Sequence, residues 1–301
     1  MKYFWKIIFL ILVLIYLVLF CNISNLEKRF KYFNSYKNIT NKSLSHSILR
    51  SCKSGKAIIL AYVMIRVDSF EKRILIRRTW ANSTLFPKMN TVFVMGLSTN
   101  KSINERVRKE NQQFNDIIQG SFIDAYRNLT HKSLIAWKWI LEKCNLAKYV
   151  VKIDDDIALN SVHLIEYFNS NPTFNRTFFC DVYYGGFPHK DKSSKWYVRD
   201  EEYENVYNRT DYPTFCLGPA YIMTADLVEQ LYKKSFNLTL FWLEDIYTAL
   251  LASRINNVTF IQFNSRYTSK SDVANRKDHV LIRDMQSAND FDNILKHIIS
   301  K

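Results

Sequence analysis

The stretch Tyr149-Val150-Val151-Lys152-Ile153-Asp154-Asp155-Asp156 contains the strongest signal in this sequence. Its first five residues are typical of a β-strand, and three consecutive carboxylates follow them. Buried charges are costly unless they are paired or bound to a metal ion, so this pattern suggests a divalent cation held at the end of a strand. Open α/β sheets bind their ligands at that edge. From composition alone, a solvated acidic turn is an equally good interpretation of these three carboxylates.

The segments around this stretch alternate between strand-like and helix-like patterns. Ser69 is placed to cap a helix, and apolar positions recur at helical spacing in residues 129–143. We predict strands at 57–65, 91–95, 116–122 and 149–153, and helices at 69–80, 104–114 and 129–143. Such alternation favours an α/β fold with a mostly parallel central sheet flanked by helices.

Composition narrows the class of protein. A chain of 301 residues with 48% hydrophobic content can form one large globular domain or two small ones. The formal net charge of +14 comes from scattered basic residues with no nucleic-acid-binding motif. We therefore expect no nucleic acid as a partner, and we expect attraction to a diphosphate donor, acidic glycans or anionic lipid heads.

The N-terminal region has a different character from the rest of the chain. Residues 7–21 form an unbroken apolar run, and residues 22–55 are rich in Asn, Ser and Lys. We predict a cytoplasmic tail at 1–6, a transmembrane signal anchor at 7–21, a luminal stem at 22–55 and a catalytic domain at 56–301. A cleaved signal peptide is the competing interpretation, although no clear cleavage site follows the run.

Glycosylation sequons indicate which side of the membrane the body occupies. The chain has ten of them, where about three are expected by chance. They lie at Asn22, Asn38, Asn41, Asn82, Asn100, Asn128, Asn175, Asn208, Asn237 and Asn257. This excess predicts a luminal body on a type II anchor, although the flanking Lys and Arg residues are weakly adverse to that orientation.

The cysteines fit an oxidising compartment. Cys21 lies at the predicted membrane boundary, which leaves Cys52, Cys144, Cys180 and Cys216 as an even set. This set predicts two disulfides of undetermined connectivity, with buried free thiols as the alternative. The spacings match no zinc motif.

Six segments with recognisable motifs follow one another along the chain. They are RILIRRTW at 73–80, FIDAYRNLTHK at 122–132, KIDDDIALN at 152–160, KWYV at 195–198, YPTFCLGPAY at 212–221 and EDIY at 244–247. In this order they resemble the motifs of the Golgi β-1,3-galactosyltransferases and their β-1,3-N-acetylglucosaminyltransferase relatives. Pro219, Ala220 and Ala249 replace glycines common in that family, and Leu217 replaces a serine, so the loop near the donor sugar is bulkier.

The resemblance implies an inverting GT-A type glycosyltransferase that uses a UDP-sugar donor and a divalent metal ion, Mn²⁺ or alternatively Mg²⁺. The metal ligands would be Asp156 and Asp154. The nucleotide side would include Arg77, Lys152, Asp154 and Asp155. Asp245 matches the general base, although a helix N-terminal acid favoured by the dipole is its alternative role.

Further motif residues are expected to line the substrate site, namely Trp196, Tyr197, Gly218, Tyr221 and Glu244. The three aromatic residues would offer flat apolar faces to sugar rings, although such residues are more often part of a core. His279 is expected to be a structural or surface residue rather than a metal ligand.

The implied function is transfer of a hexose, galactose first, or of an N-acetylhexosamine from UDP to a glycan on a glycoprotein or glycolipid. The linkage would be β-1,3, and the enzyme would be a single-pass type II protein of the Golgi membrane. The alternative is a catalytically inactive luminal relative that binds glycans or acts as a chaperone. The presence of both metal ligands and a base favours the enzyme, because a pure binder needs neither.

Overall fold

The structure is a computed structural model that describes residues 58–171, 173–272 and 279–299. The predicted tail, anchor and stem therefore lie outside the described residues. Within the described ranges, no helix has both the length and the apolar character needed to cross a membrane.

A seven-stranded sheet forms the centre of the molecule, in the order β10-β6-β9-β4-β1-β2-β3. Its strands are β1 (Ile59–Met64), β2 (Met89–Leu97), β3 (Ile117–Ile123), β4 (Tyr149–Asp154), β6 (Thr177–Cys180), β9 (Ala220–Thr224) and β10 (Thr259–Gln262). Strand β1 is parallel to both β2 and β4, whereas β9 runs antiparallel to both β4 and β6. The predicted α/β class with a mostly parallel sheet is confirmed.

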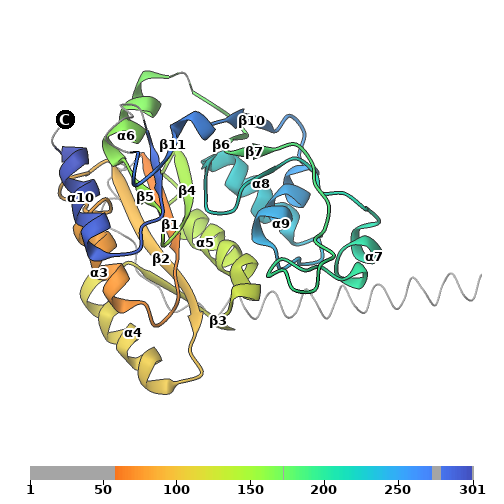
Figure 1. The fold of residues 1–301 in the computed structure, drawn as a ribbon, viewed down its shortest axis with the longest axis horizontal. Helices are drawn as coiled ribbons and strands as arrows, with labels where there is room; N and C mark the ends of the chain where they lie inside the picture. Colours follow the sequence, from red (N-terminus) through yellow and green to blue (C-terminus); the bar gives the residue numbers. More distant parts are fainter. Residues whose placement is uncertain (1–57, 172, 273–278, 300–301) are drawn as a thin grey trace, which may run out of the picture.

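Helices cover both faces of this sheet (Figure 1). Helices α5 (Leu129–Lys143), α8 (Ala225–Ser235) and α9 (Glu244–Ala252) pack on one face, and α3 (Phe70–Arg78), α4 (Lys101–Phe114), α6 (Ser161–Ser170) and α10 (Ala288–Ile299) pack on the other. Alternate residues of β1 therefore enter two different cores: Leu60 packs on the α5 side and Ala61 on the opposite side. Burial on both faces explains why this strand is a continuous apolar run.

Shorter elements connect and border the sheet. A three-stranded sheet joins β5 (Ala158–Leu159), β12 (Leu281–Arg283) and β11 (Tyr267–Ser269), and a two-stranded sheet joins β7 (Val182–Tyr183) and β8 (Phe215–Cys216). The single-turn elements are η1 (Tyr126–Asn128), η2 (Asp200–Glu202), η3 (Asn264–Arg266) and α7 (Glu204–Tyr207).

One predicted helix start is confirmed and one differs from the structure. Ser69 is the N-cap residue of α3 as predicted, although its side chain makes no capping hydrogen bond. Helix α4 begins at Lys101, earlier than predicted, because the side chain of Asn100 accepts a hydrogen bond from the Ser102 amide at 2.9 Å. A capped N-terminus extends a helix beyond the limits of its apolar pattern.

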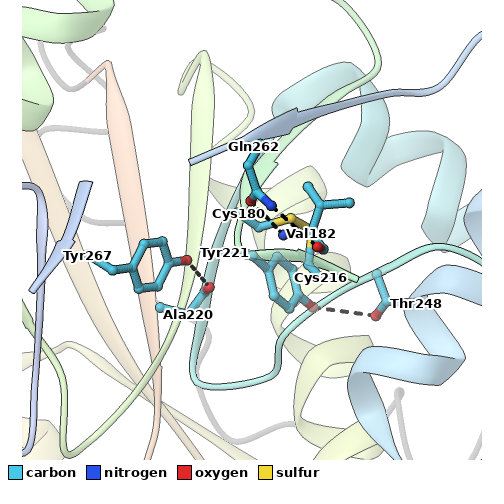
Figure 2. The surroundings of a disulfide bond; sticks show 8 residues. All are labelled: Cys180, Val182, Cys216, Ala220, Tyr221, Thr248, Gln262 and Tyr267. Atoms are coloured by element: carbon cyan, nitrogen blue, oxygen red, sulfur yellow. Dashed lines mark hydrogen bonds between the residues drawn. A yellow bond between two sulfur atoms is a disulfide. The ribbon is translucent and has the colours of Figure 1, made fainter. Parts of the chain in front are cut away.

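A disulfide and the antiparallel strand β9 place one loop beside the acidic cluster. Cys180 at the end of β6 is joined to Cys216 in β8 (Figure 2), which confirms one of the predicted disulfides. The chain then passes Gly218 and enters β9, where the carbonyl of Pro219 accepts a hydrogen bond from the Asp154 amide at 2.9 Å. Cys52 lies outside the described residues, so the second disulfide stays a prediction.

Candidate active site

Lys152 is a buried cation at the centre of the site. It lies between Tyr62 of β1 and Tyr221 of β9, and its side chain is only 2% exposed. Its amino group donates to Asp154 Oδ1 at 2.5 Å and to the carbonyl oxygen of Gly218. Burial alone would lower the pKa of Lys152, but nearby carboxylates, Asp154 first, outweigh burial and raise this pKa. Lys152 therefore stays charged and holds Asp154 in place.

The three acids at the end of β4 differ in their contacts. Asp154 contacts Lys152 and keeps 34% of its side chain exposed, and desolvation raises its pKa to about 6 despite the lysine. Asp155 forms an ion pair with Lys72 of α3 at 3.2 Å. Among the residues that the structure describes, no protein donor is hydrogen-bonded to the Asp156 carboxylate.

The different contacts of these three acids determine which of them can hold a metal ion. In the described part of the chain, no group of three or more His, Cys, Asp or Glu side chains is arranged to hold one. Mg²⁺ and similar cations are, however, often held by one or two carboxylates together with the phosphates of the substrate. The Asp156 carboxylate, which has no protein partner among the described residues, and the partly exposed Asp154 fit such a site, whereas Asp155 is engaged with Lys72.

Asp245 also lies against the Gly218 loop. It lies in the first turn of α9, where its Oδ1 accepts a hydrogen bond from the Ile246 amide at 2.9 Å. A Cβ atom at Gly218 would lie 3.0 Å from Asp245 Oδ2, so only glycine leaves this carboxylate undisturbed. Desolvation, followed by repulsion from Glu244, raises the pKa of Asp245 to about 6. One short loop thus borders both the acidic cluster and a second, protonatable carboxylate.

Glu244 lies behind Asp245, away from the surface. It is 5% exposed, and its Oε1 accepts hydrogen bonds from the hydroxyls of Ser133, Tyr221 at 2.6 Å and Thr248 at 3.3 Å. The expectation that Glu244 contacts substrate is wrong, because these hydroxyls and the surrounding core enclose it. Its negative charge nevertheless acts on the neighbouring Asp245.

Comparison with known proteins identifies the family. The sequence model described as Galactosyltransferase matches residues 71–260 of this chain. The chain belongs to the galactosyltransferase family.

Individual relatives agree with this assignment. Over 207 residues the chain is 34% identical to "Beta-1,3-galactosyltransferase 1" of Mus musculus, covering 68% of this chain and 62% of the relative. Over 237 residues it is 30% identical to "Beta-1,3-galactosyltransferase 2" of Pongo abelii, with 76% and 54% covered. The chain thus spans less than two thirds of the length of these curated relatives.

A solved structure of a glycosyltransferase involved in the glycosylation of the major capsid of PBCV-1 is a more distant likeness. It has a TM-score of 0.42 and 10% identity, and the match covers 79% of this chain and 98% of that one. So low a score carries no argument about the site.

Two motif residues of this galactosyltransferase family member have structural roles instead of the predicted binding roles. All three guanidinium nitrogens of Arg77 donate to Glu110 or Asp116, which ties α3 to α4 and to the start of β3. Tyr221 is fully buried in a central strand, packs edge-on against Phe178 and cannot offer a ring face to a sugar. Its hydroxyl points toward Thr248 of α9 (Figure 2). The predictions of a nucleotide contact and a sugar platform for these two residues are therefore wrong.

The KWYV segment lies at the rim of the site. Trp196 is 42% exposed, and its indole N–H donates to the hydroxyl of Tyr126 at 3.1 Å. Tyr197 is half-buried beside it in the same turn. Sequence reasoning missed Tyr126, although this residue lies in the FIDAYRNLTHK motif and is a large aromatic residue directly before a helix.

A buried ion pair near the end of β1 was also missed. Lys132 of α5 contacts Asp124 Oδ1 at 2.7 Å and donates to the carbonyl of Ile65 at 2.8 Å. Asp124 Oδ2 accepts a hydrogen bond from the amide of Val67 at 2.6 Å. This pair fastens the segment after β1 to α5 and to the end of β3. Both residues belong to the same sequence motif, which was the available signal.

His279 lies next to α6 and α10. It is fully buried, its ring is 3.4 Å from the side chain of Asn160, and it packs against the rings of His163 and His297. This placement agrees with the structural role expected for it.

Proposed function

We propose that this chain transfers a sugar, galactose first, from a UDP-sugar to a hydroxyl of a glycan acceptor in β-1,3 linkage with inversion. Membership of the galactosyltransferase family supports sugar transfer in general. The observation that supports this mechanism most is that Asp245 and the Lys152–Asp154 pair both lie against Gly218: its carbonyl accepts from Lys152, and a Cβ at this position would lie 3.0 Å from Asp245 Oδ2. A base and a leaving-group site that share one loop suit a direct displacement.

On the donor side, Asp156 and Asp154 would hold a divalent cation, Mn²⁺ or Mg²⁺, together with the diphosphate of the donor. Such a cation neutralises negative charge on the departing diphosphate. Lys152 would contribute by keeping Asp154 oriented and by placing a buried positive charge next to this carboxylate. Asp155 takes no part beyond its ion pair with Lys72.

On the acceptor side, Asp245 would serve as the general base. The acceptor oxygen forms a bond to the anomeric carbon, the bond from that carbon to the diphosphate breaks, and Asp245 takes the proton of the acceptor hydroxyl. A pKa of about 6 suits this role, because the carboxylate is mostly ionised at pH 7 and is more basic than an ordinary aspartate.

We also propose a luminal catalytic domain, from about residue 56, on a type II anchor in the Golgi membrane. Seven of the sequon asparagines lie in the described ranges, at Asn82, Asn100, Asn128, Asn175, Asn208, Asn237 and Asn257, and each is exposed or half-exposed. Their accessibility supports glycosylation in the secretory pathway. Treatment of the expressed protein with a glycosidase should shift its mobility, and an unchanged mobility would contradict the luminal placement.

A donor screen tests the proposed activity. The full chain would be incubated with UDP-Gal, UDP-GlcNAc or UDP-GalNAc and a panel of glycan acceptors, and UDP release and product would be measured. We expect most transfer from UDP-Gal and loss of transfer when a chelator is added.

The metal assignment needs a separate binding experiment. Asp156→Ala should remove the Mn²⁺-dependent part of UDP affinity, because it deletes a carboxylate that has no partner among the described residues and that is left to bind the cation. Asp155→Ala is the matched control and should keep this dependence, because Asp155 is paired with Lys72. Wild-type UDP affinity that is undiminished by a chelator would contradict the metal site.

A further inference from the structure

Tyr126 stands at the rim of the site with one side open. It begins η1, directly before α5, and it is 48% exposed. Its ring packs edge-on against Trp242 at a centroid distance of 6.2 Å, and Trp242 directly precedes the segment that begins α9 with Asp245. The phenol therefore lies beside the segment that leads into Asp245.

The hydrogen bond from Trp196 determines what the Tyr126 hydroxyl can do. The indole nitrogen of Trp196 can only donate, so the phenol oxygen is the acceptor in this 3.1 Å contact. Within the described residues, no acceptor is hydrogen-bonded to the hydroxyl hydrogen of Tyr126. The Tyr126 hydroxyl can therefore donate its hydrogen to a ligand in a direction away from Trp196.

The charge around Tyr126 keeps this hydroxyl a donor. Burial raises the pKa of Tyr126, and the carboxylates of Asp245 and Asp154 raise it further, so the phenol stays protonated. Tyr126 is also a partly exposed aromatic residue, and aromatic side chains suit contact with the C–H face of a sugar ring.

We propose that Tyr126 binds the acceptor sugar, donating a hydrogen bond to an oxygen next to the attacking hydroxyl, and that Trp196 is a positioning residue that fixes the Tyr126 hydroxyl. The inference rests on the proposed function, since it takes Asp245 as the acceptor-side base. The acceptor is favoured over the donor sugar because Tyr126 packs beside the segment that leads into Asp245, and because the charge of Asp245 acts on its phenol more strongly than the charge of Asp154 does.

Removal of the hydroxyl alone tests the role of Tyr126. Tyr126→Phe in the full chain should raise the KM for the acceptor about three- to tenfold, on the order of one net hydrogen bond. The KM for the UDP-sugar, and the slow hydrolysis of the UDP-sugar without acceptor, should stay within twofold of wild type. Tyr184→Phe is the matched control, because it deletes the hydroxyl of a tyrosine that is 76% exposed, and it should change neither KM.

A double-mutant cycle tests the role of Trp196. Trp196→Phe keeps an aromatic ring and deletes the indole N–H, so it should also raise the KM for the acceptor, by about twofold or more. In the Tyr126→Phe background the same substitution should add no further increase. Equal increases in both backgrounds would mean that Trp196 does not act through the Tyr126 hydroxyl.

The outcomes separate this inference from the proposed function. An active wild type with an unchanged acceptor KM in Tyr126→Phe would overturn the inference alone. An increase confined to the KM for the UDP-sugar would assign Tyr126 to the donor sugar and also overturn it. A wild type that transfers no sugar from any UDP-sugar would overturn the proposed function, and the inference with it.

Discussion

The pH dependence of transfer follows from the environment of Asp245. If Asp245 is the general base, transfer requires its ionised form, so activity falls as the pH decreases through the pKa of about 6. A base with that pKa is about 90% ionised at pH 7 and about 10% ionised at pH 5, so kcat at pH 5 should be about one tenth of kcat at pH 7. An ordinary aspartate, with a pKa of about 3.9, would leave kcat nearly unchanged over this range.

The assay must isolate Asp245 from the other carboxylate whose pKa is raised. Transfer would be measured between pH 5 and 8 at saturating donor, acceptor and Mn²⁺, since a bound cation keeps Asp154 ionised. Glu244→Gln should move the acid limb to lower pH, because it removes the negative charge that raises the pKa of Asp245. Glutamine retains an oxygen that can accept from the three hydroxyls around Glu244, and thermal unfolding would confirm that the variant is folded.

Two results would refute this reasoning. A kcat that is flat between pH 5 and 7 at saturating Mn²⁺ would show that no group with a pKa of about 6 must be ionised for transfer. An acid limb that Glu244→Gln leaves in place would show that the titrating group is not Asp245.

Two further predictions concern the loop and the buried ion pair. Gly218→Ala should lower kcat about tenfold with little change in UDP affinity, because its Cβ would stand 3.0 Å from Asp245 Oδ2 and displace the carboxylate; unchanged kinetics would contradict this contact. Lys132→Met should reduce the free energy of unfolding by about 3–5 kcal/mol, because it leaves Asp124 buried without its cation. In urea titrations Lys233→Met, which breaks the exposed pair with Glu229, should cost less than about 1 kcal/mol, and equal losses for both variants would contradict the account.

The sequence was informative wherever local pattern and burial agree. Helix α5 was predicted at 129–143 and occurs at Leu129–Lys143, because its apolar residues recur at helical spacing on the face that packs against the sheet. Strand β1 was predicted from a continuous apolar run, and its burial on both faces explains why the run is continuous.

The pairing of strands that are far apart in the sequence could not be predicted from local patterns. The antiparallel direction of β9 depends on its pairing with β4 and β6, which no local pattern encodes. The burial of Lys152 also depends on that pairing, because Tyr221 of β9 lies beside it. Charged residues in a strand are usually exposed, so only the assembled sheet makes this lysine a buried cation.

The motifs identified segments that lie in or near the candidate site, but they did not show the role of each side chain. Arg77 belongs to a matched motif, yet its partners Glu110 and Asp116 lie 33 and 39 residues further along the chain and were not foreseeable. Tyr221 and Tyr126 are both motif tyrosines, and only the fold places the first in the core and the second at the rim. Identical residue types thus acquire opposite roles from the strand or turn that carries them.

The most direct test of the central claim compares Asp245→Asn with the wild type. Transfer from UDP-Gal and binding of UDP in Mn²⁺ would be measured on the same preparations of the full chain. The account predicts unchanged UDP affinity and a loss of transfer of about 10²–10⁴-fold, the range typical of a general base. An Asp245→Asn variant that retains UDP binding and transfers sugar at the wild-type rate would contradict the assignment of Asp245 as the base.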